Sequence, residues 1–294
     1  MGKAESITEL ELILSNLIQS AAGPDCPPLL GQALAHAVFP GGARIRPKLC
    51  LAIARANACD TPELALRAAA AVEFLHCASL VHDDLPCFDD ADMRRGKPTV
   101  HKAFSEPLAV LAGDALIVAA FEAVGSLVLD SRTATRMPKV ISILARGTGA
   151  PYGICAGQAW ESEPSVNVSL YHQAKTGALF VAATCAGAAT AGVDSGPWAE
   201  LGTSIGEAYQ VADDIQDAIA TPEQLGKPCA QDVHLDRPSA VAELGVQGAA
   251  QKLRELIERG LDSVPACQGR DKLLELVRAQ AQGFVPKGLN SIAA

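Results

Sequence analysis

Apolar residues recur at helical spacing along almost the whole 294-residue chain, and this periodicity constrains the fold more than any other feature. The stretch ITELELILSNLIQSA, for example, places Ile7, Leu10, Leu14 and Leu17 on one helix face. No run of alternating apolar and polar residues competes with this pattern. Alanine and leucine dominate, and aromatic residues make up only 4%, which favours helices over strands. We therefore predict an all-α chain.

Long apolar segments predict helices that pack inside a bundle and are joined by short connections rich in glycine and proline. Thr61 and Ser105 stand at the expected N-caps of two of these helices. The predicted helices include residues 61–81, 105–129, 169–192 and 197–220, and the predicted connections include 39–47, 94–99 and 226–232. Two further predicted helices, 249–264 and 271–282, are amphipathic and more peripheral. Because no linker, repeat or low-complexity segment separates them, we expect a single domain over residues 1–294.

The overall charge argues against two classes of partner. The formal net charge is −9, and no block of lysine and arginine occurs, so nucleic acid and anionic membrane surfaces are poor partners. No apolar run approaches the ~20 residues of a membrane span, so no stable membrane insertion is expected. The nine cysteines form no C-x-x-C pair, and the first twenty residues do not resemble a signal peptide. We therefore expect reduced thiols and a cytoplasmic location.

An acidic cluster ends one of the predicted apolar helices. Asp83 and Asp84 stand side by side, Pro86 stops the helix, and Asp89 completes a D-D-x4-D pattern. The carboxyl end of a helix carries partial negative charge, so aspartate there is unfavourable by ~0.3–1 kcal/mol. Mg²⁺ prefers such hard oxygen ligands and usually completes its shell with water and substrate phosphates. The pattern therefore predicts a magnesium site, with a solvated polar loop as the alternative.

Three cations follow the acidic cluster directly. Arg94, Arg95 and Lys97 lack the i,i+4 spacing of a surface salt-bridge ladder. Arginine beside a metal ion is a common way to hold a diphosphate, because the guanidinium fork matches phosphate oxygens. The cations therefore favour a metal and diphosphate site, whereas the later Asp90 and Asp92 fit the solvated loop better.

A second acidic cluster lies in the segment YQVADDIQDAIA. Asp213 and Asp217 are four residues apart and so share one helix face, with Asp214 next to Asp213 in the chain. Like charges at this spacing destabilise a helix, and apolar surroundings increase the cost. A solvated acidic face would carry lysine or glutamate at neighbouring turns, so metal binding is the better interpretation of this pattern too.

Several single residues carry weaker signals. Lys175 lies in a largely apolar segment, where a buried ammonium is costly unless it meets an anion. Gln158 and Gln210 are consistent with either a site or helix packing, and His76 and His82 with ordinary core or capping histidines.

Together these motifs resemble the trans-polyprenyl diphosphate synthases, the family of farnesyl and geranylgeranyl diphosphate synthases. The resemblance covers nearly the whole chain, through PGGARIRP, HCASLVHDDLPCFDDADMRRGKPTVHKAF, LAGDAL, GICAGQAWE, KTGALF, YQVADDIQD and LGKPCAQD. The variants GGARIRP and ICAGQAWES are most similar to geranylgeranyl diphosphate synthases of carotenoid-making, especially photosynthetic purple, bacteria. The resemblance implies an isoprenoid-synthase-type helical bundle around a deep central cavity, usually as a homodimer.

The implied reaction depends on Mg²⁺ and joins isopentenyl diphosphate head-to-tail to dimethylallyl, geranyl or farnesyl diphosphate. The departing diphosphate needs its charge neutralised, and the allylic cation must meet an alkene in a dry cavity. The resemblance assigns Asp83, Asp84, Asp89, Asp213 and, in support, Asp217 to the metal. It assigns Arg94, Lys175 and Lys227 to the allylic diphosphate, Arg46, His76 and Arg95 to isopentenyl diphosphate, Thr176 and Gln210 to the reacting carbons, and Asp214 to the catalytic set.

Three positions depart from the family pattern. Ala43 replaces the lysine of the usual GGKR, which removes one cation from the isopentenyl diphosphate site. Glu161 stands where aspartate is commoner, and DRPSAV, with Arg237, replaces a segment that usually carries lysine. The cations that remain close to Ala43 in the sequence are Arg44, Arg46 and Lys48.

Product length is expected to depend on the helix that ends at Asp83. Ala78 lies five residues earlier, which is about 7.5 Å along a helix, where farnesyl-producing relatives tend to have an aromatic plug. Alanine leaves room for a longer tail, so geranylgeranyl diphosphate is the expected product. Ser79 and Leu75 are the other residues expected to affect chain length.

Four alternatives stay open at this point. Farnesyl diphosphate or a longer-chain diphosphate is the alternative product. A terpene cyclase should carry an Asn/Ser/Glu-type second motif, and a head-to-head synthase two D-x-x-x-D motifs, and neither pattern is present. A catalytically weak regulatory subunit should have lost aspartates, whereas both clusters are intact and only Ala43 favours that interpretation.

Overall fold

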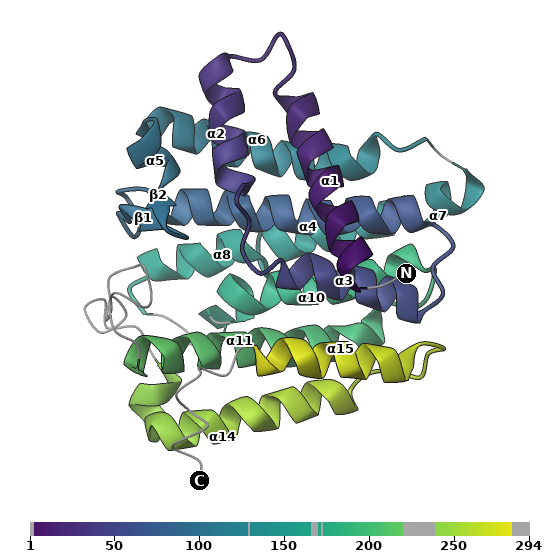
Figure 1. Ribbon diagram of the computed structural model, residues 1–294. Helices are drawn as coiled ribbons and strands as arrows, with labels where there is room; N and C mark the ends of the chain where they lie inside the picture. The colour runs from purple at the N-terminus through teal and green to yellow at the C-terminus, as the bar shows by residue number, and fades with distance from the viewer. Residues whose placement is uncertain (1–2, 129, 166–169, 172, 220–238, 284–294) are drawn as a thin grey trace. The chain divides into compact units, whose positions relative to one another are not determined.

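The computed structural model describes residues 3–128, 130–165, 170–171, 173–219 and 239–283 (Figure 1). Over these residues the regular structure is helical apart from one short β-hairpin, which confirms the all-α prediction. The chain divides into two compact units, which are described separately, and the single domain stays a prediction. The first unit comprises Met1–Arg55, Cys59–Leu144 and Ala186–Val193, and the second comprises Ala56–Ala58, Ala145–Cys185 and Asp194–Ala294.

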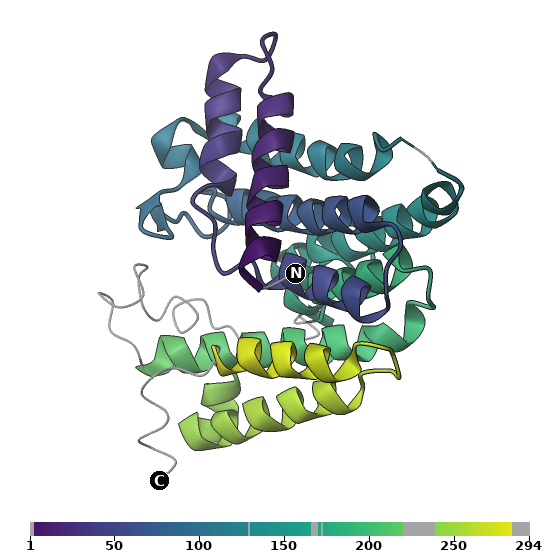
Figure 2. The same cartoon turned by 45° about the vertical axis from the view of Figure 1, so that its right-hand side comes forward.

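The first unit is built on two apolar helices, α4 (Pro62–Asp83) and α6 (Glu106–Gly125), which run side by side in both views (Figure 2). Small side chains allow this close packing, because Ala68 to Ala71 of α4 and Ala112, Ala119 and Ala120 of α6 are all buried. The other helices of this unit are α1 (Lys3–Ala21), α2 (Pro28–Val38), most of α3 (Ile45–Ala56), α5 (Val100–Ala103), most of α7 (Ser131–Thr148) and the end of α10 (Ala178–Thr190).

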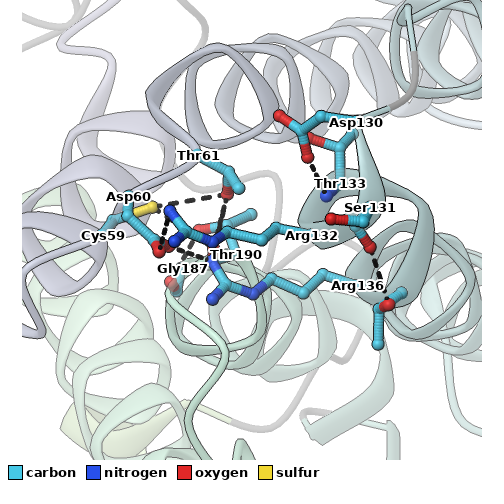
Figure 3. A network of polar contacts seen from close by, with 11 residues as sticks. Cys59, Asp60, Thr61, Asp130, Ser131, Arg132, Thr133, Arg136, Gly187 and Thr190 are labelled. Carbon is cyan, nitrogen blue, oxygen red and sulfur yellow. Dashed lines mark hydrogen bonds and ion pairs between the residues drawn. The ribbon is translucent and has the colours of Figure 1, made fainter.

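The start of α4 is tied to α7 and to the end of α10 by a polar network (Figure 3). Thr61 is the N-cap residue of α4 as predicted, but its hydroxyl makes no cap bond to its own helix and instead donates to the carbonyl of Thr190 at 2.7 Å. Arg136 of α7 donates to the same carbonyl at 3.0 Å and also pairs with Asp60. The predicted cap at Ser105 is confirmed, since its hydroxyl accepts from the Leu108 N–H at 3.3 Å.

The predicted connection 94–99 contains a two-stranded hairpin, β1 (Met93–Arg94) and β2 (Lys97–Pro98). Its two turn residues, Arg95 and Gly96, have φ angles of 54° and 76°. Positive φ at both residues is typical of two-residue hairpin turns, because such a turn matches the twist of the two strands. The hairpin therefore fixes Arg95 at the turn directly after the first acidic cluster.

The second unit contains α8 (Ile154–Ala159), short 3₁₀ turns at Trp160–Ser162 and Gly196–Trp198, α11 (Ala199–Ile219), α14 (Ala240–Asp262) and α15 (Arg270–Gln282). Helices α11 and α14 share an apolar core that includes Val211 and Ile215 on one side and Leu253 and Leu256 on the other. The predicted helix 169–192 is not uniform, because a π-helical segment, η2 (Gln173–Gly177), precedes α10.

Among the residues that the structure describes, two helices are long and apolar enough to cross a membrane by length and composition alone, so the expectation that no run approaches a span was wrong. They are α4 and α6, and in their most apolar windows 72% and 44% of the residues are buried within the structure. Core helices of globular proteins pass the same test, so the result is weak evidence for a membrane span.

Candidate active site

The first acidic cluster lies where α4 ends, at Asp83, as the sequence predicts. The following turn folds back on the helix end, because the Asp89 N–H donates to the Asp83 carbonyl at 3.0 Å and the Ala91 N–H to the Asp84 carbonyl at 3.2 Å. Asp83 and Asp89 are partly exposed, whereas Asp84 is only 3% exposed. The motif thus leaves two carboxylates accessible and buries the third.

The buried carboxylate of Asp84 is held by Arg94. Arg94 Nε lies 2.7 Å from Oδ1 and 2.9 Å from Oδ2, and Nη2 lies 2.6 Å from Oδ1. Burial raises the pKa of Asp84 above its ordinary value, and the Arg94 hydrogen bonds oppose that rise. Burial lowers the pKa of Arg94, but the hydrogen bond to Asp84 and the negative charges of Asp84, Asp83 and Asp89 together raise it above its ordinary value, so the pair stays ionic. The sequence did not predict this ion pair. The resemblance had assigned Asp84 to the metal and Arg94 to the allylic diphosphate.

The three aspartates of the first cluster do not form a preassembled metal site. Over the described part of the chain, no group of three His, Cys, Asp or Glu side chains could hold a metal ion together. The donor chemistry nevertheless fits Mg²⁺, because Asp83 and Asp89 are accessible carboxylates and magnesium takes much of its shell from water and phosphate. The assignment of these residues to a metal stays a prediction.

The glycine loop PGGARIRP lies against two arginine side chains of the first unit. A Cβ on Gly42 would lie 2.9 Å from Nη2 of Arg95, and one on Gly41 would overlap the guanidinium group of Arg44. Side chains at these two positions would therefore push the guanidinium groups away. The loop backbone therefore lies directly beside the side chain of Arg95.

Arg44 is a structural cation. It is buried, its φ is 52°, and it donates to Glu11 of α1 at 2.9 Å and to Glu73 of α4 at 2.5 Å. Because two carboxylates neutralise it, Arg44 does not replace the cation that Ala43 removes. The ammonium of Lys48 lies at that position, since it donates to the Ala43 carbonyl at 2.6 Å.

His76 of α4 lies among positive charges. Burial, and then the charges of Arg46 and Arg95, hold its pKa well below the ordinary value for histidine. These interactions place the three residues in one neighbourhood, the Arg46–His76–Arg95 cluster. An anion here would find two guanidinium groups and an imidazole, which are groups that suit phosphate oxygens, and the assignment of this cluster to isopentenyl diphosphate stays a prediction.

A pocket beside Asp84 extends the same charged region. Lys97 donates to the backbone carbonyls of His36 and Phe39, the latter at 2.5 Å, and so ties the hairpin to the end of α2. Burial, and then the charge of Arg95, lower the pKa of Lys97. The polar residues that line the pocket include Asp84, Arg94, Arg95, Lys97 and Thr99, and the apolar ones include Leu80 and Val81.

The second acidic cluster lies on α11 in the second unit. Asp213 and Asp217 are partly buried one turn apart, as the spacing predicts, and Asp214 is only 6% exposed. Asp214 Oδ1 accepts from the side-chain amide of Gln210 at 3.0 Å, and Oδ2 accepts from the backbone N–H of Ala240 at 2.7 Å. Asp214 thus bonds within the protein and joins α11 to the start of α14.

Gln210 extends these hydrogen bonds to the π-helical segment η2. Its Oε1 accepts from the Thr176 hydroxyl at 2.9 Å. The two elements approach closely because a Cβ on Gly206, one turn before Gln210, would lie 2.9 Å from the Cα of Gly177. Thr176 and Gln210, both assigned to the reacting carbons, are therefore in direct contact.

Lys175 meets the anion that its apolar surroundings require. Its ammonium donates to Glu161 Oε1 at 2.5 Å, and the hydroxyl of Tyr171 donates to the same oxygen at 2.7 Å. The ammonium also lies 5.7 Å from the centre of the Tyr171 ring. π-helical turns such as the one that holds Lys175 occur frequently at functional sites. Sequence reasoning found Lys175 but missed Tyr171, which no motif marked.

The remaining predicted residues have mixed outcomes. Ala78 and Leu75 are buried in α4, and the partly buried Ser79 donates to the His76 carbonyl at 2.8 Å. His82 contacts the Val110 carbonyl at 3.2 Å and packs on Gly113, so it is a packing histidine. Lys227 and Arg237 lie outside the described residues.

Comparisons with known proteins agree with these features. The family model for polyprenyl synthetase matches residues 27–272. The chain is 53% identical over 277 residues to the geranylgeranyl diphosphate synthase of Cereibacter sphaeroides, an alignment that covers 94% of this chain and 96% of that protein. It is 49% identical over 272 residues to the geranylgeranyl diphosphate synthase of Rhodobacter capsulatus, with 92% and 93% covered.

A solved structure has the same fold. It is the geranyltransferase from Helicobacter pylori complexed with magnesium and isoprenyl diphosphate, with a TM-score of 0.80, 29% identity, and coverage of 95% of this chain and 98% of that one. The isoprenoid-synthase-type fold is thereby confirmed. Because the family model covers most of the chain and both relatives match along almost their full length, the chain belongs to the polyprenyl synthetase family.

Proposed function

We propose that this protein is a geranylgeranyl diphosphate synthase, which condenses isopentenyl diphosphate head-to-tail with allylic diphosphates. The observation that carries the proposal is the close likeness, over nearly the full length of both chains, to two proteins of that name. The small residue Ala78, five residues before Asp83 on α4, supports a product longer than farnesyl diphosphate. We propose that this product is used in carotenoid biosynthesis.

Magnesium is the proposed cofactor. A solved structure of a related geranyltransferase was determined with magnesium and isoprenyl diphosphate, which supports the assignment. Asp83 and Asp89 would hold the ion in the first unit, and Asp213, supported by Asp217, would do so in the second. Asp84 would join them only if Arg94 released it. When bound, the metal would neutralise the charge that develops on the departing diphosphate.

The protein groups have separate roles in this proposal. The Arg46–His76–Arg95 cluster binds the diphosphate of isopentenyl diphosphate. Arg94, Lys175 and Lys227 bind the allylic diphosphate. Both Arg94 and Lys175 are paired with carboxylates in the structure, so each would exchange that partner for a phosphate oxygen. Thr176 and Gln210 lie beside the carbons that react, where their oxygen atoms favour positive charge.

The test is a product assay with purified protein, Mg²⁺, isopentenyl diphosphate and farnesyl diphosphate. We expect the twenty-carbon diphosphate, the next product after the fifteen-carbon substrate. Asp83→Ala and Asp213→Ala should abolish condensation while the protein stays folded. Asp92→Ala is the matched control, because Asp92 lies in the same acidic stretch but pairs with Lys102 at 2.9 Å. Normal turnover in either of the first two variants would refute the metal assignment.

We also propose a homodimer that forms through α6, in the cytoplasm. Three large apolar residues of α6 are exposed, namely Val110, Leu111 and Val118, at 42%, 53% and 65%. Such a patch suits a protein interface. All eight cysteines among the described residues are free, which agrees with a reducing compartment. Light scattering should find a dimer that Val118→Glu converts to a monomer, whereas Leu12→Glu, at an exposed position of α1, should not.

A further inference from the structure

Asp214 stands at one end of a hydrogen-bonded chain that ends at Thr176. The carboxylate accepts from Gln210 Nε2 at 3.0 Å, and Gln210 Oε1 accepts from the Thr176 hydroxyl at 2.9 Å. The other carboxylate oxygen accepts from the Ala240 N–H at 2.7 Å, which fixes the carboxylate against the start of α14. We propose that Asp214 is a positioning residue that sets the hydrogen-bond direction of Gln210 and, through it, of Thr176. This inference rests on the proposed function.

The direction of the chain follows from what each group can donate. A carboxylate can only accept hydrogen bonds, so Gln210 must turn its NH₂ group toward Asp214. Its carbonyl oxygen is then turned toward Thr176, whose single hydroxyl proton must point back at Gln210. The lone pairs of the Thr176 oxygen are left for the other side. A carboxylate at position 214 therefore makes Thr176 an acceptor toward whatever lies next to it.

A Thr176 hydroxyl that acts as an acceptor suits a reaction in which positive charge develops on the substrate. If Thr176 lies at the allylic carbons, its oxygen presents partial negative charge to the cation that forms as diphosphate departs. The reverse orientation would present a proton to the same cation and would raise its energy. The burial of Asp214, at 6% exposed, excludes most water from the bonds that fix this orientation.

Asparagine at position 214 would reverse the direction with little change of shape. The Ala240 N–H is a fixed backbone donor, so the single oxygen of the asparagine amide would serve it and the amide NH₂ would face Gln210. Gln210 would then turn its own NH₂ toward Thr176. In Asp214→Asn the Thr176 hydroxyl would have to accept that bond, and its proton would point the other way.

The experiment exchanges the acid and the amide. Asp214→Asn should lower kcat about 10- to 100-fold, the usual size of an effect on a supporting residue, with the KM of both substrates nearly unchanged. Gln210→Glu should also lose activity, because it faces Asp214 with a second carboxylate. The double variant Asp214→Asn/Gln210→Glu restores the pattern, since the introduced amide donates to the introduced carboxylate, which in turn accepts from Thr176. It should regain most of the lost kcat.

A matched control distinguishes a role of Asp214 in positioning Gln210 from a role in stabilising the start of α14. Ser239 caps that helix by accepting from the Val241 N–H at 3.2 Å and has no part in the chain to Thr176. Ser239→Ala should lower Tm without lowering kcat. If Asp214 only held the helix, Asp214→Asn, which keeps the bond to Ala240, would have normal kcat, and that result would overturn the inference.

The remaining outcomes also decide the matter. A double variant no more active than the single ones, with a higher Mg²⁺ concentration needed for half-maximal rate, would show that Asp214 binds metal and would overturn the positioning role. Wild-type protein that forms no prenyl diphosphate would overturn the proposed function and this inference with it. Active wild type with an unaffected Asp214→Asn variant would overturn the inference alone.

Discussion

Arg94 binds Asp84 through two nitrogens, with Nε 2.7 Å from Oδ1 and Nη2 2.6 Å from the same oxygen. The Asp84 side chain is 4% exposed, so removing its partner leaves a buried carboxylate without its cation. We expect Arg94→Ala to lower the free energy of unfolding by about 3 kcal/mol, the low end for a broken buried pair because the Arg94 side chain is 32% exposed. Urea denaturation measures this loss.

The control for that prediction neutralises the acid. In an Asp84→Asn background, Arg94→Ala should cost much less, because no charge is then left unpaired. Equal losses in both backgrounds would show that Arg94 stabilises the protein by packing and not by pairing with Asp84.

Gly157 of α8 is needed where that helix meets Lys175. A Cβ at Gly157 would overlap the backbone nitrogen of Lys175 and would lie 2.5 Å from its Cα, and backbone atoms cannot rotate away. Gly157→Ala should therefore displace the π-helical segment, lower stability by about 1–3 kcal/mol, and reduce kcat. Thermal unfolding and steady-state rates measure the two effects.

A second glycine provides the comparison. Gly125 is the last residue of α6, and an added Cβ there would meet nothing within 4 Å among the described residues. Gly125→Ala should leave activity unchanged and raise stability by up to about 1 kcal/mol, because alanine restricts the unfolded chain. A Gly157→Ala variant that behaves like Gly125→Ala would contradict the close approach.

Ala78 provides the test of product length. The helix α4 is continuous from Ala78 to Asp83, so the two residues are separated by about 7.5 Å along its axis. Ala78→Val and Ala78→Phe should shorten the product in order of side-chain size, as measured by chromatography of the dephosphorylated products. Ala78 is 1% exposed, so some loss of stability should accompany the larger side chain. An unchanged product would mean that another residue sets the length.

The features that the sequence predicted correctly depend on local rules. The end of α4 at Asp83 follows from Pro86, and the cap at Ser105 follows from the spacing to the Leu108 N–H. The isoprenoid-synthase fold was predicted from the family motifs rather than from these local rules, and the solved structure of the same fold confirms it. In the helix end and the cap, neighbours within one or two turns of helix determine the outcome.

The features that the sequence did not predict depend on partners far along the chain. Thr61 satisfies every local rule for an N-cap, but its hydroxyl bonds to Thr190, 129 positions away. Glu161 serves as the partner of Lys175 across 14 positions, and no spacing rule marks that pair. A favourable long-range bond outcompetes a local one when both partners are buried, and only the folded arrangement shows which groups meet.

His76 should make stability depend on pH. Burial, and then the charges of Arg46 and Arg95, hold its folded pKa well below the unfolded value of about 6.5. Between those two values the unfolded chain binds more protons, so the free energy of unfolding should fall as the pH drops below about 6.5. One such group contributes at most about 1.4 kcal/mol per pH unit. His76→Gln should therefore flatten the curve between about pH 6.5 and 5, as measured by urea denaturation across that range.

Bound diphosphate should raise the pKa of His76, because its negative charge would offset the charges of Arg46 and Arg95. His76 should then take up a proton. Titration of wild type with diphosphate near pH 6 should consume protons, and His76→Gln should consume fewer. Equal uptake by the two proteins would place the anion away from His76.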